Sequence, residues 1–248
     1  MEKASISPFI VRAADCDIRA RMRMDALFVQ MQEGAEVNAS SHGASREDLL
    51  TRGLFFALVR TSVHVSRMPR AKERILHKTW PGAANRFFFP RYHVFSSESG
   101  EELACASSLW VTLNRETRHI VSPPESGLCF PDTSEISPPL PLPTRLPSVQ
   151  GDSISEGSRI PAYSDFDLNG HVNNTRYISW LCDMLGRERL DHAVIQDLTC
   201  GYEKEIPDTQ PVKLRLVEQE NRFGFQVLSD EDARHFQASL TLQEEPYV

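Results

Sequence analysis

The sequence lacks the features that mark several large classes of protein. Its five cysteines, at positions 16, 105, 129, 182 and 200, form no Cys-x-x-Cys pair, and an odd count argues against a disulfide framework. Buried free thiols are the simpler interpretation. No run approaches the roughly 18 apolar residues that a membrane-spanning helix needs, and the first residues carry no apolar signal-peptide core. We therefore expect a cytoplasmic protein without a membrane span.

Motifs that bind cofactors are also missing. The chain has no glycine-rich phosphate-binding loop, no Gly-x-Ser-x-Gly elbow and no cluster with metal-ligand spacing, so we expect neither a cofactor nor a metal. Of its 248 residues, 40% are hydrophobic and 25% charged. That composition is ordinary for a globular protein with a real core, built as one large domain or two of usual size.

The net charge of −7 conceals an uneven distribution. Residues 1–120 hold 17 Lys and Arg against 13 Asp and Glu, whereas the remainder holds 10 against 21. A local positive field can steer association, so we predict a docking face for an acidic partner in the first part, made by Arg19, Arg21, Arg23, Arg70, Lys72 and Arg74. Scattered surface charge is the alternative. Nucleic acid is not expected as a partner, because its binding motifs are missing and the whole chain is acidic.

A proline-rich stretch divides the chain into two similar segments. Residues 121–157 hold eight of the sixteen prolines, many serines and no apolar periodicity, which is typical of a linker. Short matches flank it, since Asn85-Arg-Phe87 recurs as Asn221-Arg-Phe223 and Ala106-Ser107 as Ala238-Ser239. We therefore predict an internal duplication, with one domain at 1–120 and the other at 158–248.

Both segments show the same predicted order of elements. Each begins with a short strand, at 9–14 and 159–164, and continues with an amphipathic helix. The apolar positions of the two helices are Met24, Leu27, Phe28, Met31 and Ala35, and then Ile178, Leu181, Cys182 and Leu185. Four β-rich runs follow each helix, at 55–68, 74–80, 86–96 and 102–113, and at 193–206, 212–220, 222–229 and 235–242. This order predicts an α+β fold in which a curved antiparallel sheet wraps its own helix.

The most informative stretch is the polar loop before the second helix. It holds six Asp, Asn and His residues within ten positions: Asp165, Asp167, Asn169, His171, Asn173 and Asn174. Core packing does not require such a set, and Asn169-Gly170 indicates a turn that leads into a helix start. The free N–H groups and positive dipole of a helix start suit a developing oxyanion. The structural alternative is that these residues only shape the turn and cap the helix.

The run Asp167-Leu-Asn-Gly-His-Val-Asn-Asn-Thr-Arg-Tyr177 resembles the loop and helix start of acyl-acyl carrier protein (ACP) thioesterases. The order of elements is similar to the double hotdog of that family over almost the whole chain outside the linker. Matches in the first half are Met31-Gln-Glu33, Arg67-Met-Pro69, Thr79-Trp80 and Trp110. The resemblance implies a tandem hotdog fold and hydrolysis of fatty acyl-ACP thioesters, with ACP as the partner.

The resemblance also implies a catalytic set in the second half. Asp, Asn, His and Glu of the plant members correspond to Asp167, Asn169, His171 and Glu205. Many plant members have a Cys after that Glu, whereas this chain has Ile206, so attack by water is favoured. Either Glu205 or Asp167 is then the general base, with Asn169 and His171 positioning water or polarising the thioester. We expect backbone N–H groups around Gly170, Val172 and Asn173 to form an oxyanion hole.

The first half is expected to serve the acyl chain and not the chemistry. Alignment of Pro69 with Pro207 places Arg67 opposite Glu205, and Asp15-Cys-Asp-Ile-Arg19 opposite the catalytic loop, without its Asn and His. In relatives the N-terminal hotdog lines the fatty-acyl pocket. The resemblance thus implies a pocket in which bulky residues set chain length: Met24, Phe28, Met31, Phe55 and Trp80.

Three other functions remain open beside acyl-ACP hydrolysis. An acyl-CoA thioesterase would catalyse the same hydrolysis, and only the thiol that carries the acyl group would differ, coenzyme A in place of ACP. An acyl-binding protein without turnover is disfavoured, because it would have no need of a polar set confined to one half. A dehydratase on the same fold is disfavoured by the lack of a His-x-x-x-x-Pro-Gly run. A homodimer is also left open.

Overall fold

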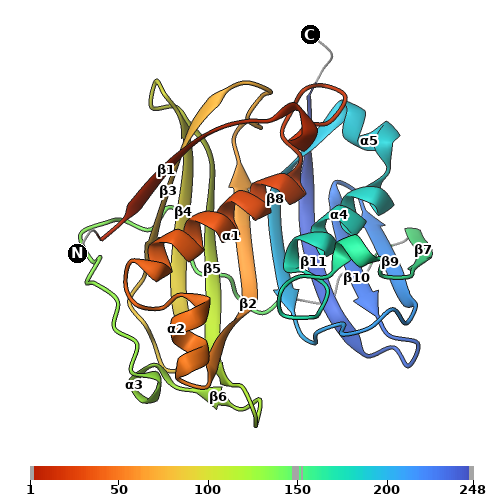
Figure 1. Cartoon of the computed structure of the whole chain (residues 1–248). Coiled ribbons are helices and arrows are strands. Elements are labelled where there is room, and N and C mark those ends of the chain that lie inside the picture. Colours follow the sequence, from red (N-terminus) through yellow and green to blue (C-terminus); the bar gives the residue numbers. More distant parts are fainter. Residues whose placement is uncertain (1–2, 147–150, 152, 246–248) are drawn as a thin grey trace.

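Two long helices, α1 (Met24–Ser40) and α4 (Asn174–Leu185), lie across one face of a continuous antiparallel sheet (Figure 1). The structure is a computed structural model and describes residues 3–146, 151 and 153–245. Its shorter helices are α2 (Arg46–Thr51), α3 (Pro123–Ser126) and α5 (Arg187–His192). Single 3-10 turns at Ala13–Asp15 and Tyr163–Asp165 precede the two long helices.

The sheet joins both halves of the chain. Its first-half strands are β1 (Ser5–Ile10), β2 (Leu54–Val65), β3 (Arg74–Pro81), β4 (Phe89–Ser97), β5 (Glu102–Asn114) and β6 (Ile120–Val121). The second half adds β7 (Ser153–Arg159), β8 (Ala193–Tyr202), β9 (Val212–Gln219), β10 (Arg222–Leu228) and β11 (Arg234–Glu244). The order is β1-β3-β4-β5-β2-β8-β11-β10-β9-β7, with β6 paired to β5. The two halves of this order mirror each other, so the predicted duplicated α+β hotdog is confirmed.

β2 and β8 form the seam between the halves. They pair antiparallel from Arg60 opposite Gly201 to His64 opposite Asp197. Side chains add to this ladder, because the hydroxyls of Ser62 and Thr199 lie 2.9 Å apart and cross-strand pairs stabilise a sheet. One sheet therefore holds both helices in fixed positions.

The predicted helix faces are buried in one shared core. Leu27 and Phe28 of α1 and Ile178 and Leu181 of α4 are all at most 2% exposed, and all belong to one apolar cluster. Burial of such side chains stabilises the fold by about 1.5–3 kcal/mol each. Asp25 of α1 also accepts a hydrogen bond from Ser179 of α4 at 3.0 Å.

The predicted boundaries fail at the first strand of each half. We expected strands at 9–14 and 159–164, but β1 and β7 lie earlier and their predicted ends form the 3-10 turns. β7 has the sequence Ser-Ile-Ser-Glu-Gly-Ser-Arg, whose low strand propensity gave no signal. Backbone pairing with β9 defines it instead.

The predicted linker is partly wrong, because ordered elements occupy its ends. β6 ends at Val121, α3 follows at Pro123, and β7 begins at Ser153. Between them the chain is attached to the first sheet, since Ser107 Oγ donates to Pro141 O and Thr133 Oγ1 to Pro81 O, both at 2.6 Å. Linker positions 147–150 and 152 lie outside the described residues.

Candidate active site

The loop before α4 is a closed turn attached to the segment after β8. Gly170 has a φ of 79°, a conformation that glycine adopts without strain. Its N–H donates to Asp167 O at 3.0 Å, and the Asp167 N–H donates to His171 O at 3.1 Å. The Val172 N–H donates to Ile206 O at 2.9 Å. This last bond brings the loop beside Glu205.

Both carboxylate oxygens of Asp167 are used inside the loop. Oδ1 accepts from the Asn169 N–H at 2.8 Å, and Oδ2 accepts from Asn173 Nδ2 at 3.2 Å. Asn173 is also the N-cap of α4, because its Oδ1 accepts from the Thr175 N–H at 2.9 Å. Asp167 therefore fixes the loop to the helix start.

His171 and Glu205 face each other across the entrance of a cavity. His171 Nε2 lies 3.6 Å from Glu205 Oε1, with side chains 18% and 40% exposed. His171 Nδ1 lies 3.3 Å from Val172 O and 4.0 Å from Asp167 Oδ1. Each ring nitrogen of His171 therefore faces an oxygen acceptor, Nδ1 the Val172 carbonyl and Nε2 the Glu205 carboxylate. Three of the four residues predicted as catalytic thus lie together.

Two arginines of the first half complete this site, and sequence reasoning missed them. Arg46 of α2 donates from Nε to Asn169 Oδ1 at 3.2 Å and from Nη2 to Leu168 O at 3.3 Å. Arg118, between β5 and β6, donates from Nη1 to Glu205 Oε1 at 3.4 Å and covers the Phe55 ring. The prediction that the first half takes no part in the chemistry is therefore too simple. The first half contributes two arginine side chains, which contact Asn169 and Glu205.

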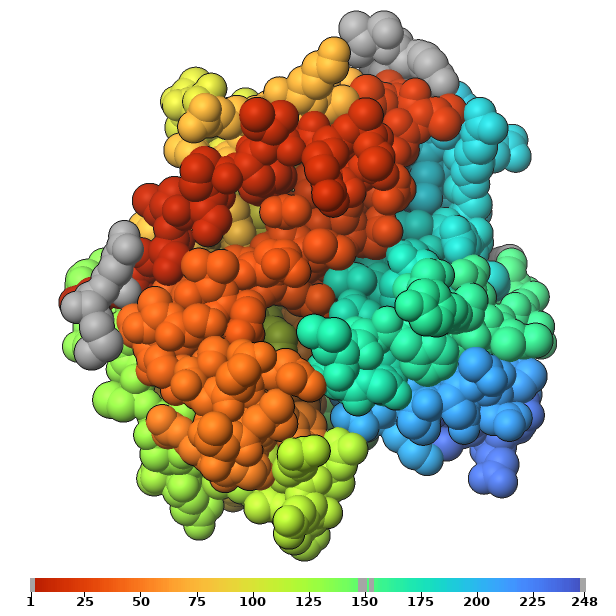
Figure 2. Space-filling view, in the orientation of Figure 1, coloured from red at the N-terminus to blue at the C-terminus, as the bar shows by residue number. Residues whose placement is uncertain are grey.

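A cavity of about 1570 Å3 extends from these groups into the first half. In Figure 2 the surface is hollowed between the orange residues of α2 and the teal loop before α4. Asp167, Asn169, His171 and Glu205 all line it. The rest of its wall is largely apolar, with Leu49, Phe55, Phe56, Leu58, Phe89, Trp110, Leu113 and Phe130.

The predicted acyl-pocket residues lie mostly elsewhere. Phe55 lines the cavity, whereas Met24, Phe28 and Met31 belong to the sealed core between α1, α4 and the sheet. Trp80 lies on the outer face of the sheet beside Tyr92, because its neighbour Thr79 points inward to Arg91 and strand residues alternate. The assignments of Met24, Phe28 and Met31 were wrong because a helical stripe does not distinguish a core from a cavity wall. The assignment of Trp80 was wrong because its side chain takes the other face of the strand.

The predicted oxyanion hole is also wrong in part. The N–H groups of Gly170, Val172 and Asn173 all donate to backbone carbonyls of the protein. Within the described residues, the His171 N–H has no such acceptor. The three predicted donors are therefore already used within the protein.

The predicted docking face contains two buried members. Arg21 is 3% exposed and pairs with Glu245 and Asp17, each at 2.7 Å. The Arg19 side chain is 8% exposed and donates to Asp191 O and Glu245 O. Neither can touch a partner's surface, so the prediction is wrong for both. Arg23, Arg70, Lys72 and Arg74 are exposed.

The backbone corrects the alignment of the two halves. Asp17, Ala20 and Arg21 repeat the hydrogen bonds of Asp167, Gly170 and His171, so the counterpart of His171 is Arg21 and that of Asn169 is Arg19. The Met22 N–H donates to Pro69 O as Val172 donates to Ile206 O, which places Met68 and not Arg67 opposite Glu205. The loop with Asp167, Asn169 and His171 thus occurs in one half, and arginines bound to Glu245 occupy the counterparts of Asn169 and His171.

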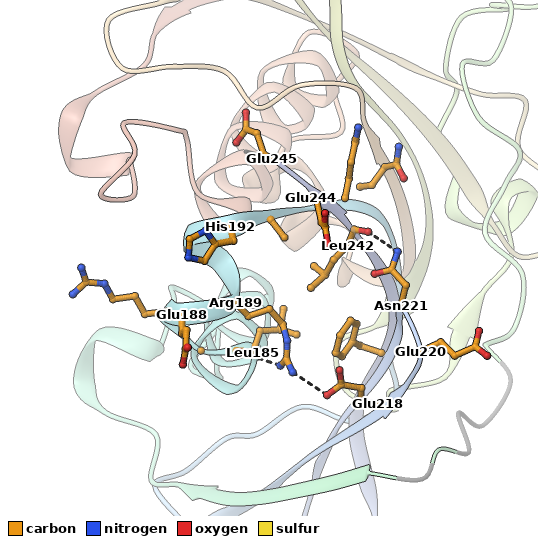
Figure 3. A pocket seen from close by; sticks show the side chains of 16 residues that line it. Leu185, Glu188, Arg189, His192, Glu218, Glu220, Asn221, Leu242, Glu244 and Glu245 are labelled. Carbon is orange, nitrogen blue, oxygen red and sulfur yellow. Dashed lines mark hydrogen bonds and ion pairs between the residues drawn. The ribbon is translucent and has the colours of Figure 1, made fainter. Parts of the chain in front are cut away.

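A second hollow, of about 1390 Å3, lies in the second half beside this counterpart loop. Figure 3 shows Arg189 reaching Glu218 across it, at 2.9 Å. Glutamates dominate its wall, with Glu188, Glu218, Glu220, Glu244 and Glu245.

Burial keeps the inner thiols protonated. It raises the pKa of Cys182 and of Cys200 to about 12, and a thiol is a nucleophile only as its thiolate. Ile206, directly after Glu205, is 2% exposed and packs in the core. In the described part of the chain, no helix has the length and hydropathy to cross a membrane.

The fold and the cavity with its polar entrance define a double hotdog protein. Comparison with protein-family models gives a match to the acyl-ACP thioesterase N-terminal domain over residues 3–126 and to the C-terminal domain over residues 152–244. The chain therefore belongs to the acyl-ACP thioesterase family.

Relatives and solved structures agree with this assignment. The chain is 28% identical over 209 residues to a chloroplastic palmitoyl-acyl carrier protein thioesterase of Gossypium hirsutum, covering 79% of this chain and 51% of that one. It is 26% identical to a dodecanoyl-[acyl-carrier-protein] hydrolase of Cinnamomum camphora, covering 79% and 55%. The chain thus spans about half the length of the relatives it matches.

Two solved structures share the whole architecture. An acyl-ACP thioesterase from Bacteroides thetaiotaomicron superposes with a TM-score of 0.84 at 22% identity, covering 97% of this chain and 98% of that one. The 12:0-ACP thioesterase from Umbellularia californica gives 0.83 at 21% identity, with 99% of each chain covered. These likenesses establish the fold.

Proposed function

We propose that this protein hydrolyses the thioester of a fatty acyl group carried by ACP and releases the free fatty acid. The observation that carries the proposal is the His171–Glu205 pair at the entrance of a long, mainly apolar cavity. A cavity of this kind suits an acyl chain, and the pair lies where the thioester would enter. Family membership and the names of the relatives support the same reaction.

In the proposed reaction, Glu205 is the general base. Among the described residues, its Oε1 accepts one hydrogen bond, from Arg118 at 3.4 Å, and lies 3.6 Å from His171 Nε2. Both oxygens of Asp167 instead accept hydrogen bonds within the loop. Glu205 takes a proton from water as the water oxygen attacks the thioester carbon. The carbon–sulfur bond then breaks, and the thiol leaves with a proton returned by the site. A positioned base of this kind typically contributes roughly 10² to 10⁴ in rate.

His171 and Asn169 position the reactants in this proposal. His171 Nε2 and Glu205 Oε1 are 3.6 Å apart, so one water molecule in the cavity beside the pair could form a hydrogen bond with both. The His171 N–H is the free donor for the carbonyl oxygen as it becomes negative. Arg46 holds the Asn169 side chain at the cavity wall.

Hydrolysis of acyl-CoA is the second candidate, because the reaction would be the same and only the carrier of the acyl group would differ. The test is turnover of matched acyl-ACP and acyl-CoA thioesters of one chain length. We expect kcat/KM to be higher for acyl-ACP. A higher kcat/KM for acyl-CoA would mean that coenzyme A carries the acyl group of the substrate. No turnover of either thioester would reject the proposed reaction.

A further inference from the structure

A buried guanidinium in the cavity wall, that of Arg91, has no ion-pair contact with any carboxylate of the described residues. Arg91 of β4 is 6% exposed and lines the cavity. Its Nη1 donates to Asn38 Oδ1 at 2.9 Å and lies 3.4 Å from Thr79 Oγ1. Both acceptors are neutral, and no carboxylate in residues 3–146, 151 or 153–245 forms an ion pair with it. Since a guanidinium carries five N–H donors, Nε and Nη2 remain available to a ligand.

The groups around Arg91 do not supply the missing charge. His93 and His77 lie 3.0 Å apart, Nδ1 to Nε2, and burial lowers the pKa of His77 to about 3 and that of His93 well below its ordinary value. Both rings are therefore neutral. Glu36 also lines the cavity and attracts Arg91 from farther away. It forms no hydrogen bond with the guanidinium, and its Oε1 accepts from Ser40 Oγ and the Arg46 N–H.

Burial of a cation that is not paired with a contacting anion is unfavourable. Burial lowers the pKa of Arg91 to about 10. Asn38, which orients the guanidinium, is itself fixed by donating to Ser5 Oγ at 2.8 Å. A guanidinium that is held in place and short of an anion is typical of a binding site for a carboxylate or phosphate.

Arg91 lies at the far end of the acyl path from the catalytic pair. β2 and β5 separate β4 from β8 in the sheet, which at about 4.8 Å per strand puts roughly 14 Å between β4 and the strand that leads to Glu205. Phe55, Phe56 and Phe89 line the wall between them. An acyl chain with its thioester at Glu205 would cross this apolar wall and present its far end to Arg91.

We propose that the substrate is an acyl thioester whose far end carries a carboxylate, which Arg91 binds. The inference rests on the proposed thioester hydrolysis and specifies its substrate class. A methyl end would leave the guanidinium buried and unpaired, whereas a carboxylate would pair with the free Nε and Nη2 donors. Sites with buried polar groups discriminate strongly against analogues that lack the matching group.

The test compares acyl thioesters of equal length that end in a methyl, a hydroxyl or a carboxylate. We expect wild-type kcat/KM to be at least about tenfold higher for the carboxylate end, the effect of one charge-assisted hydrogen bond. Equal or better turnover of the methyl end would overturn the inference and leave thioester hydrolysis standing. A preference for the hydroxyl end would overturn the carboxylate assignment. No turnover of any substrate would reject the proposed function itself.

Arg91→Met is the informative variant, and Arg52→Met is its matched control. Arg52 is an exposed arginine of the same half that does not line the cavity. Arg91→Met should remove the preference for the carboxylate end, whereas Arg52→Met should keep it. A short acyl thioester that does not reach β4 should be hydrolysed equally by both variants, which checks that the site is intact.

A binding measurement on the wild-type protein does not depend on the folding of any variant. By isothermal titration calorimetry, the monomethyl ester of an α,ω-dicarboxylic acid should bind at least about tenfold more tightly than the methyl ester of the monocarboxylic acid of the same length, because only the first offers Arg91 a carboxylate. Equal affinities would contradict the inference.

Discussion

At the scale of single residues, Glu205 and Asp167 differ in what their carboxylates already bind. Asp167 holds the loop through both oxygens, whereas Glu205 is 40% exposed at the cavity entrance. The sequence left open which of the two is the base, because the spacing of residues in a loop does not show which groups form hydrogen bonds with a carboxylate. The geometry favours Glu205.

Glu205→Gln should lower kcat by roughly 10² to 10⁴ with little change in Tm, because the amide keeps its shape and loses its basicity. Asp167→Asn should lower Tm as well, since about 1 kcal/mol is lost with each broken loop hydrogen bond. Steady-state kinetics and thermal unfolding of both variants test this. Nearly normal turnover in Glu205→Gln would instead assign the base to Asp167.

The buried thiols lead to a second prediction at this scale. Because burial raises the pKa of Cys182 and Cys200 to about 12, almost no thiolate exists at pH 7 and alkylation should be slow. Cys182→Ala and Cys200→Ala should retain most of the wild-type kcat. Mass spectrometry of the enzyme during turnover should detect no acylated cysteine, and finding one would reject attack by water.

At the scale of elements, the prediction from sequence succeeded where periodicity was strong. The apolar stripes at Met24–Ala35 and at Ile178–Leu185 lie within α1 and α4, and the β-rich runs correspond to strands. It failed for short pieces without periodicity. α2 was missed although Ser45 and Asp48 form a capping box, the one local signal of its start.

The missed helix α2 carries Arg46, and its effect on catalysis can be measured. Arg46→Ala should free the Asn169 side chain, and Arg118→Ala should free Glu205. We expect kcat to fall about tenfold in each, which corresponds to one charge-assisted hydrogen bond. Arg52→Ala, at the C-cap of the same helix, is the control and should have normal kinetics. Normal turnover in all three would confine the site to the second half.

Packing of α1 on β3 depends on Gly34. A Cβ there would overlap the His77 imidazole, which cannot move because it stacks between Phe95 and His93. Gly34→Ala should therefore destabilise the protein by about 1–3 kcal/mol in urea unfolding. The double variant Gly34→Ala/His77→Ala should show a coupling that offsets part of this cost. Additive losses would mean that His77 is not the obstacle.

At the scale of the whole molecule, duplication was visible in the sequence but the sharing of the site was not. Short repeats such as Asn85-Arg-Phe87 and Asn221-Arg-Phe223 revealed two similar halves. Arg46 and Asn169 are 123 residues apart in the sequence, and Arg118 and Glu205 are 87 residues apart. A local sequence pattern cannot predict contacts between residues so far apart. The same holds for Arg21, whose burial against Glu245 could not be read from a basic stretch.

The position of the remaining basic residues changes the expectation for carrier docking. The Ala71 N–H donates to Ala20 O and Arg70 pairs with Glu245, so Arg70, Lys72 and Arg74 belong to the end of the molecule near α5. The catalytic loop lies at the opposite end of α4, whose 12 residues span about 18 Å. Lys204, in contrast, is exposed beside Glu205 and lines the cavity entrance.

We therefore expect Lys204→Glu to raise KM for acyl-ACP several-fold, because it reverses a charge where an acidic carrier would deliver its thioester. Lys72→Glu is the matched control, an exposed lysine at the far end, and should change KM little. Salt should weaken the wild-type interaction, since the screening length is about 10 Å at 0.1 M, and should matter less for Lys204→Glu. Steady-state kinetics at two ionic strengths test all three. A larger rise in KM for Lys72→Glu than for Lys204→Glu would indicate that the carrier docks on the basic stretches of the first half, as the sequence predicted.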